Sequence, residues 1–408
     1  MKKQSTMYAV KYAPTFSLHD TLSIMCFISW RWAEGDRFGI LEGPYNFVPD
    51  PNLPLPQKVY DTLPMRELAL NRAASLLERA RKENRKLAIL WSGGVDSTSI
   101  IAAFRLAGAS TSDLIILHTN DSIQEYLRGY LKMKNEDGFL MKCYSWEDSL
   151  SAYESLGDSV IFVTGWCADQ LFGSIVNGNF PELYDTLWKD GMRKVIRGTI
   201  DRVNNSESYA RVFRFLMRNP LSVKDSEIDM FLDEFDAYAK KIGIELKYTC
   251  DATWLANFGI KWSHVSRDLQ LTMENDEQRK NVVNFYDDIS FQEWAMVNYR
   301  KYHLHNQVLD TENYKRVLKE IVFEYFKDET FLKMKGKQNS WSSVVPGSIL
   351  RYAPMRIWDT EKGFLSIDIR QQNKETLFER QEMNTRKALL PYLKKSVDRE
   401  RFLSGEVW

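Results

Sequence analysis

The segment from Leu87 to Thr98, LAILWSGGVDST, constrains the fold of this chain more than any other part of the sequence. Its apolar start, at 87–91, predicts a buried strand, and helical spacing of apolar residues predicts a helix over 97–107. Between them, Gly93 and Gly94 allow a sharp turn whose backbone can approach a ligand without a Cβ clash. The segment is therefore expected to run from strand through glycine turn to helix.

Strand and helix patterns continue to alternate after this segment. Further short apolar runs predict strands at 114–117, 139–144 and 160–163. Apolar residues at helical spacing predict a helix over 121–132. This order predicts an α/β protein with a parallel sheet covered by helices on both faces. Ligands of such sheets bind outside the carboxyl ends of the strands, where the glycine turn lies.

The chain of 408 residues is expected to divide into three parts. Residues 1–56 form a short aromatic-rich segment that ends in a proline-rich connector, and residues 57–185 form the α/β core. Residues 186–408 form a mainly helical region, with amphipathic stripes at 209–217 and 228–235.

Charge and cysteine content narrow the class of protein. Lys+Arg and Asp+Glu each number 55, so a dedicated nucleic-acid binder is not favoured, although a local basic groove stays open. The four cysteines form no CxxC pair, which argues against a disulfide scaffold or structural zinc site. No signal peptide and no apolar run of about 18 residues is present. A soluble, cytoplasmic protein without membrane association is expected.

The glycine turn has the composition of an anion cradle. The helix that follows presents free N–H groups and the positive end of its dipole, and nearby serine hydroxyls add donors. Asp96 would repel phosphates unless it holds Mg²⁺, which bridges both anions. No GxxxxGK[ST] motif occurs, so this is not the usual P-loop. The alternative is a plain glycine turn in which Asp96 or Ser97 caps the helix.

Two segments carry a resemblance to a known superfamily. The sequence SGGVDS at 92–97 resembles the SGGxDS motif of the PP-loop ATP pyrophosphatases. The sequence VTGWCADQLFG at 163–173 resembles the SGEGADELFGG motif of the asparagine synthetase synthetase domain. Weaker similarities link 284–287 and 333–338 to the PFLD segment and late lysine loop of that family. The resemblance covers roughly residues 57–345.

The resemblance implies a PP-loop, Rossmann-like fold that binds ATP and Mg²⁺. The pyrophosphate part of ATP would be held by Ser92, Gly93, Gly94 and Ser97. The adenosine part would be contacted by Trp91, Leu117, Thr164 and Gly165. Asp96 and Asp169 would hold Mg²⁺ and take part in catalysis. Lys337, or alternatively Lys335, would neutralise the departing pyrophosphate.

The activity implied by the resemblance is ATP-dependent adenylation. A small-molecule carboxylate would attack the α-phosphate, and ammonia or an amine would open the adenylate to an amide. The glutamine-using members begin with a cysteine after the initiator Met, whereas this sequence has Lys2. The glutaminase domain is therefore expected to be lacking, so that free ammonia, an amine, or a separate glutaminase or carrier partner is needed.

The second motif departs from the family at two acids. Trp166 and Gln170 stand where the family has Glu, and the first exchange removes a general base. Trp166 either covers a flat substrate or packs. Cys167 and His118 are each open to a chemical or a structural role, and the Asp287–Asp288 pair to amine binding or helix capping.

Two other functions stay open. Adenylation of a nucleobase, nucleoside or tRNA would use the same ATP site and would depend on Cys167 in its sulfur-transfer form. A catalytically degenerate ATP-binding protein would instead serve a structural or interaction role. In that case the N-terminal aromatic residues would form a docking surface, although burial in the core is the alternative; they are Phe27, Trp30, Trp32 and Phe38.

Overall fold

The structure is a computed structural model of the chain. It describes residues 56, 59–143, 155–173, 181–205, 224–260, 262, 265–266, 278, 280–302, 312–336, 355–359 and 363–367. Three expected features lie outside these residues: the aromatic N-terminal segment, the stripe at 209–217 and Lys337.

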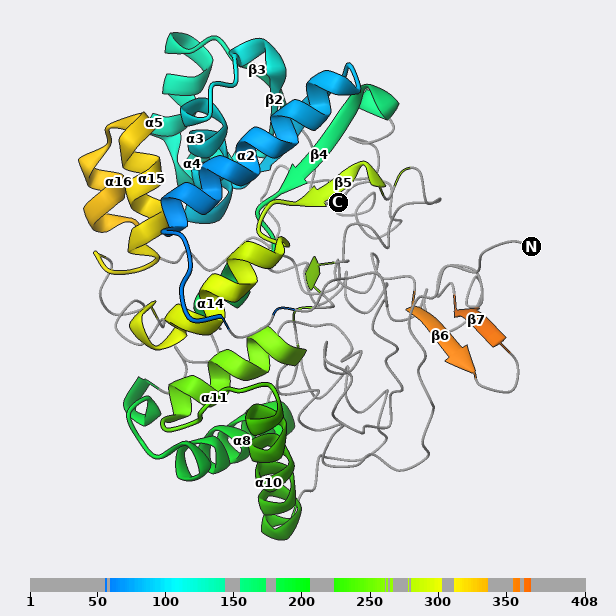
Figure 1. The fold of residues 1–408 in the computed structure, drawn as a ribbon, viewed down its shortest axis with the longest axis vertical. Coiled ribbons are helices and arrows are strands. Elements are labelled where there is room, and N and C mark those ends of the chain that lie inside the picture. The colour runs from blue at the N-terminus through cyan, green and yellow to red at the C-terminus, as the bar shows by residue number, and fades with distance from the viewer. Residues whose placement is uncertain are drawn as a thin grey trace, which may run out of the picture.

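The main sheet has five strands, all parallel, in the order β3-β2-β1-β4-β5. They are β1 (Lys86–Trp91), β2 (Leu114–His118), β3 (Leu140–Cys143), β4 (Val160–Thr164) and β5 (Val282–Asn284). Two further strands, β6 (Met355–Asp359) and β7 (Gly363–Ile367), form a separate antiparallel pair. The predicted α/β class with a parallel sheet is confirmed (Figure 1).

The described residues also form a series of helices, some packed against the sheet and others below it (Figure 1). The α-helices are α2 (Met65–Lys82), α3 (Val95–Leu106), α4 (Asn120–Glu125), α5 (Leu127–Leu131), α7 (Ala168–Phe172), α8 (Trp188–Asn205), α10 (Asp225–Lys241), α11 (Thr249–Leu255), α14 (Ile289–Tyr302), α15 (Arg316–Phe326) and α16 (Glu329–Met334). Short 3₁₀ turns occur at Thr111–Asp113, Gly157–Ser159 and Pro181–Leu183, and π turns at Lys132–Glu136 and Ala256–Ile260.

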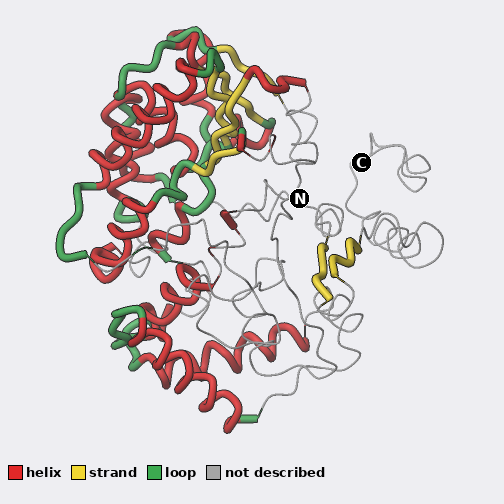
Figure 2. The backbone as a smooth tube through the Cα atoms, turned by 45° about the vertical axis from the view of Figure 1, so that its right-hand side comes forward, coloured by secondary structure: helices red, strands yellow, loops and turns green. Residues whose placement is uncertain are grey.

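Strands β1, β2 and β4 are buried on both faces, as expected for parallel strands with near-continuous apolar sequences, whereas β3 at the edge of the sheet is largely exposed. Leu87, Ile89 and Trp91 of β1 join the large core that also contains the apolar residues of α2 and α3. Ala88 and Leu90 join a smaller cluster on the opposite face. In Figure 2 most of the described helices lie on one side of the sheet, so helices on both faces remain a prediction.

The strand order alone, before any side chain is considered, predicts where a ligand would bind. From β1 the chain moves outward to β2 and β3 on one side, and β4 and β5 lie on the other. The order reverses between β1 and β4, and at such a point the loops that leave the two strands open a crevice at their carboxyl ends. The glycine turn follows β1, and the segment 163–173 spans the end of β4 and all of α7.

The single helix expected over 121–132 is wrong, because the helix is interrupted at Tyr126. This residue has φ −146° and ψ 67°, which ends α4 and lets α5 begin. Its buried ring packs against Phe326 and Phe331, and its hydroxyl donates to Asp328 Oδ2 at 3.2 Å. Packing of one aromatic side chain therefore overrides the local helical pattern, and it ties α4 to α16.

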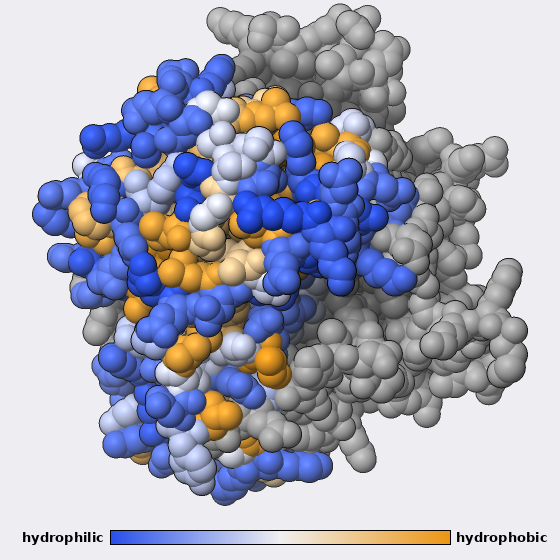
Figure 3. Space-filling view, turned by 45° about the horizontal axis from the view of Figure 1, so that its top comes forward, coloured by the Kyte–Doolittle hydropathy of each residue, from blue (hydrophilic) through white to orange (hydrophobic). Residues whose placement is uncertain are grey.

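The lower part of the molecule consists of α8, α10 and α11, with α14 between them and the sheet (Figure 1). The stripe predicted at 228–235 is confirmed, since its apolar members are buried in α10. On the face drawn in Figure 3, hydrophobic residues gather in small patches separated by hydrophilic ones. Within the described residues, no helix is both long and apolar enough to span a membrane.

Candidate functional site

The glycine turn adopts a backbone that only glycine accepts easily. Gly93 has φ +80°, and a Cβ there would lie 2.5 Å from the carbonyl oxygen of Ser122. Gly94 is the N-cap of α3. The first N–H groups of a helix have no intrahelical acceptor, so the turn presents donors toward the sheet edge.

Two serine hydroxyls hold this turn together. Ser97 Oγ accepts from the Ser92 N–H at 3.0 Å and lies 3.0 Å from Ser92 Oγ. Ser92 Oγ also accepts from the Gly94 N–H at 3.3 Å. All four residues predicted for pyrophosphate, Ser92, Gly93, Gly94 and Ser97, are thus brought together in one short turn.

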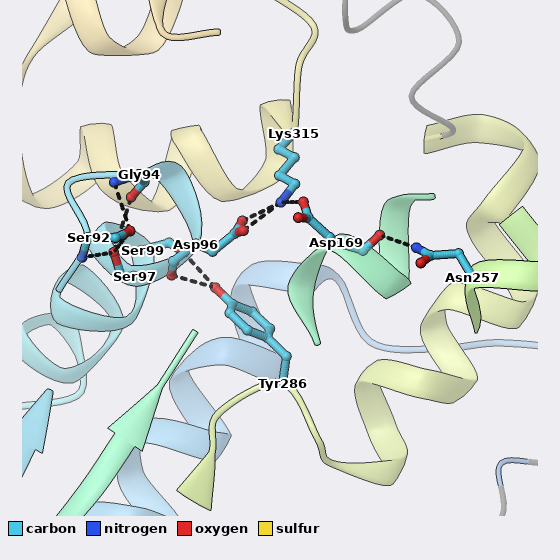
Figure 4. A network of polar contacts seen from close by, with 9 residues as sticks. All are labelled: Ser92, Gly94, Asp96, Ser97, Ser99, Asp169, Asn257, Tyr286 and Lys315. Atoms are coloured by element: carbon cyan, nitrogen blue, oxygen red, sulfur yellow. Dashed lines mark hydrogen bonds and ion pairs between the residues drawn. The ribbon is translucent and has the colours of Figure 1, made fainter. Parts of the chain in front are cut away.

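The two predicted metal ligands converge on one point. Asp96 lies in the first turn of α3 and Asp169 in the first turn of α7, the helices that follow β1 and β4, the two strands between which the strand order reverses. Lys315 Nζ lies 2.6 and 2.7 Å from the two carboxylate oxygens of Asp96 and 2.5 Å from Asp169 Oδ1 (Figure 4). The carboxyl groups therefore face each other across a single ammonium.

Lys315 is the functional residue that sequence reasoning missed. Its side chain is 0% exposed, and it sits just before α15 with φ +46° and ψ 40°. Burial would lower its pKa, but the charges and hydrogen bonds of Asp169 and Asp96 outweigh burial and raise the pKa above its usual value. The side chain is therefore a permanent cation at the centre of the site.

A sequence signal for this lysine does exist. Lys315 and Lys319 lie on the same stripe as Leu318 and Val322, which are buried in α15. A charged residue on an apolar stripe is seldom fully buried unless it is paired, so it points to a buried partner.

The main chains of both acids are anchored from the side opposite to Lys315. The hydroxyl of Tyr286 lies 2.6 Å from Ser99 Oγ and 3.2 Å from the carbonyl oxygen of Asp96. Burial raises the pKa of Tyr286, so the phenol stays neutral. Asn257 Nδ2 donates to the carbonyl oxygen of Asp169 at 3.0 Å (Figure 4). These contacts fix the main-chain positions from which the two carboxylate side chains extend.

The loops after β1 and β4 touch through their backbones. A Cβ on Gly165 would lie 3.1 Å from the backbone nitrogen of Ser97 and 3.3 Å from the carbonyl carbon of Asp96. Thr164 is buried, and its Oγ1 donates to Asn284 Oδ1 at 2.5 Å. Gly165 therefore permits the close approach that brings Asp96 and Asp169 together.

The other residues predicted to contact adenosine are buried. The Trp91 indole donates to Thr98 Oγ1 at 3.0 Å inside the main core. Leu117 belongs to the smaller cluster on the other face. Both side chains are therefore enclosed by apolar neighbours, and the carbonyl oxygen of Trp91 accepts from Ser122 Oγ at 2.7 Å.

A second lysine lies beside the glycine turn. Lys335 Nζ donates to Glu125 Oε1 at 2.8 Å, and Lys319 Nζ donates to the backbone oxygen of Lys335 at 3.4 Å. Glu125 Oε1 is itself 3.3 Å from where a Cβ on Gly94 would stand. Of the two lysines predicted to serve pyrophosphate, the structure places Lys335 next to the turn, while Lys337 lies outside the described residues.

Trp166 and Gln170, which stand where the asparagine synthetase motif has Glu, make structural contacts. Trp166 is half-buried and packs against the smaller cluster, in line with a packing role. Gln170 is buried and its Nε2 donates to Asn257 Oδ1 at 3.2 Å, while its Oε1 is buried with no hydrogen-bond partner. Cys167 is buried in the left-handed conformation at the start of α7, with φ +73°.

The remaining candidates have local structural explanations. His118 is buried against Tyr130, and burial lowers its pKa, so the imidazole is neutral at pH 7. Asp288 Oδ1 accepts from the Ser290 N–H at 3.1 Å, which is the contact expected of a helix cap. Asp287 accepts from the Trp262 indole at 2.9 Å.

The pair of carboxylates fits Mg²⁺ that arrives with phosphate. The side chains of Asp96 and Asp169 are 24% and 33% exposed and supply hard oxygen ligands. Among the described residues, no group of three or more His, Cys, Asp or Glu side chains could hold a metal. Mg²⁺ commonly uses one or two carboxylates and completes its shell with water and substrate phosphates. Asp96 and Asp169 could therefore supply Mg²⁺ with only part of its ligands, and Lys315 Nζ already contacts three of their carboxylate oxygens.

Comparison with known proteins adds no family assignment. Neither a scan against protein-family models nor a search of curated proteins found a match. The features of this chain that bear on function are the geometry around Asp96, Asp169 and Lys315 and the motif at 92–97.

Proposed function

We propose that this chain is a PP-loop type enzyme that binds Mg²⁺ and ATP at the carboxyl edge between β1 and β4 and transfers the adenylyl group to a substrate. One observation carries the proposal. Two acids from separate strand-end loops, Asp96 and Asp169, converge on a single buried cation, Lys315, beside a glycine turn. That combination supplies donors for phosphate, ligands for Mg²⁺ and a fixed positive charge.

Each part of the site has a task in phosphoryl chemistry. The turn at 92–97 would hold the β- and γ-phosphates through main-chain N–H groups and serine hydroxyls. Asp96 and Asp169 would hold Mg²⁺, which supplies neutralisation of phosphate charge when bound. Lys315 keeps the two acids from repelling each other and from repelling the nucleotide. Lys335, which pairs with Glu125 beside the turn, would stabilise the charge that develops on departing pyrophosphate.

We assign a carboxylate as the acceptor and ammonia or an amine as the second substrate, which gives an amide. The likeness to asparagine synthetase motifs at 92–97 and 163–173 supports this choice. The structure offers no acid at Trp166 or Gln170 to act as a base. The nucleophile would then have to react as a neutral amine or reach the site from a partner glutaminase or carrier.

ATP binding without turnover is the second candidate, and Gln170 favours it. Its amide is buried and paired with Asn257, where a catalytic acid would need access to substrate. Sulfur transfer to a nucleobase or tRNA has less support, because the Cys167 side chain is buried.

The test is pyrophosphate release from ATP in the presence of Mg²⁺ and panels of carboxylates with ammonia or amines. Asp96→Asn and Asp169→Asn should each reduce release at least 100-fold, because each removes a Mg²⁺ ligand. The matched control is Asp190→Asn, an exposed acid of α8, which should have no effect.

Three outcomes separate the candidates. Release that survives either substitution refutes the metal assignment. Tight ATP binding by calorimetry with no release for any substrate pair identifies the non-catalytic alternative. Release that depends on a nucleoside or RNA and is lost in Cys167→Ser identifies sulfur-dependent modification.

A further inference from the structure

One member of the charge pair over the glycine turn has no role in the proposed chemistry. Glu125 is the last residue of α4, and its Oε1 lies 2.8 Å from Lys335 Nζ. A Cβ on Gly93 would lie 2.9 Å from Glu125 Cβ, and one on Gly94 would lie 3.3 Å from Glu125 Oε1. The carboxylate thus lies against the turn, which is an unfavourable place for an anion if the turn binds phosphates.

The pairing with Lys335 explains how the carboxylate is tolerated there. The side chains of Lys335 and Glu125 are 9% and 21% exposed, so the ion pair is partly shielded from water. While paired, the lysine is neutralised and cannot attract a nucleotide. A phosphate bound at the turn would therefore have to compete with this carboxylate for Lys335.

Both partners are carried by elements that are tied together. Tyr126, the residue after Glu125, donates to Asp328 Oδ2, and Asp328 also accepts from the Phe331 N–H as the N-cap of α16. Lys319 holds the backbone of Lys335. Since both main chains are anchored, an exchange of partners at Lys335 needs only side-chain rotation.

We propose that Glu125 is a specificity-determining residue that competes with the phosphates of the nucleotide for Lys335. This inference rests on the proposed function. Glu125 holds Lys335 until a ligand brings anionic groups to the turn, and it takes the lysine back when pyrophosphate leaves. A monophosphate does not place charge at this position, so Glu125 weakens the binding of triphosphate and pyrophosphate but not of AMP, and it keeps pyrophosphate from binding too tightly.

The experiment is calorimetric titration of the full chain with three probes in Mg²⁺: inorganic pyrophosphate, a non-hydrolysable ATP analogue and AMP. Glu125→Gln should bind the first two roughly fivefold more tightly, because a partly exposed charge interaction is worth about that factor, and AMP equally well. The matched control is Glu329→Gln, which removes an acid that pairs with Lys333 on the exposed surface of α16 and should change nothing.

The outcomes separate this inference from the proposed function. If the unsubstituted chain binds neither pyrophosphate nor the ATP analogue, both fail. If it binds them but Glu125→Gln binds equally or more weakly, Glu125 positions Lys335 or ligates the metal, and only the competition is overturned. Glu125→Ala removes the same carboxylate differently, and it must tighten the same two probes for the inference to stand.

Discussion

Two lysines approach the region of the glycine turn, and the fold holds them in different ways. Lys315 meets two carboxylates and is 0% exposed, whereas Lys335 meets Glu125 and is 9% exposed. A fully buried ammonium cannot move without leaving two carboxylates without a counter-charge. A partly exposed lysine that pairs with a single carboxylate can exchange partners at little cost. The comparison suggests that Lys315 is part of the architecture, while Lys335 is available to ligands.

Lys315→Met should have the largest effect. It leaves Asp96 and Asp169 facing each other without a counter-charge, so the free energy of unfolding should fall by about 3 kcal/mol, at the low end for a buried pair because both acids are partly exposed. Urea unfolding measures the loss. Lys335→Met is the matched control and should lose about 1 kcal/mol or less. Equal losses would abolish the distinction between the two lysines.

The next largest effect should be the stabilisation of the fold by Mg²⁺ and nucleotide together. Because Lys315 already neutralises part of the charge of the two acids, Mg²⁺ alone should bind weakly and shift the melting temperature little. Mg²⁺ with a non-hydrolysable ATP analogue at about 100 times Kd should stabilise the fold by about 2.7 kcal/mol. Thermal unfolding with and without a chelator checks this. A large shift with Mg²⁺ alone would instead indicate a resident metal site.

Substitutions of the two acids should also differ in how much they lower the free energy of unfolding. Asp96 lies in the first turn of α3, which has 12 residues, whereas Asp169 lies in the first turn of α7, which has 5. The longer helix of Asp96 and its two contacts with Lys315 Nζ, against one contact for Asp169, favour its negative charge more. Asp96→Asn should therefore cost about 1 kcal/mol more than Asp169→Asn in urea unfolding. The reverse order would show that Lys315 depends mainly on the loop after β4.

Tyr126→Phe should have the smallest effect and act on the Lys335 side alone. Loss of the hydrogen bond to Asp328 should cost about 0.5–1 kcal/mol at pH 8. Burial, followed by the charge of Asp328, raises the pKa of Tyr126, so the folded chain keeps this proton when the unfolded chain loses it. The contribution is present below the ordinary tyrosine pKa of about 10 and declines above it, so the variant and the unsubstituted chain should converge as the pH rises above 10. A gap that widens above pH 10 would contradict this sign.

Much of the sheet could be predicted because its strands carry strong local patterns. The first four strands and α3 follow from apolar runs and helical spacing near one another in sequence. The fifth strand, Val282–Asn284, was not predicted, because three residues give no periodicity and its partner β4 lies more than a hundred positions earlier. The break at Tyr126 escaped because its cause is packing against Phe326 and Phe331.

The site was predictable where residues adjoin a motif and unpredictable where they come from elsewhere. Asp96 and Asp169 each follow a strand closely, so the local sequence already places them at the carboxyl edge of the sheet. Lys315 precedes a helix in a lysine-rich stretch, and only the folded chain brings its Nζ to both acids. Glu125 ends a helix whose boundary itself depended on a distant contact.

The backbone contact at Gly165 has a consequence for how substrate preference can change. Because the two loops meet main chain against main chain, their separation does not depend on which side chains follow. Under the proposed function, position 166 could therefore be altered to reshape the acceptor side of the site while the gap between the two acids stays constant. Any larger residue at 165 would place its Cβ 3.1 Å from the backbone nitrogen of Ser97 and act as a wedge that presses the two loops, and with them the two acids, apart.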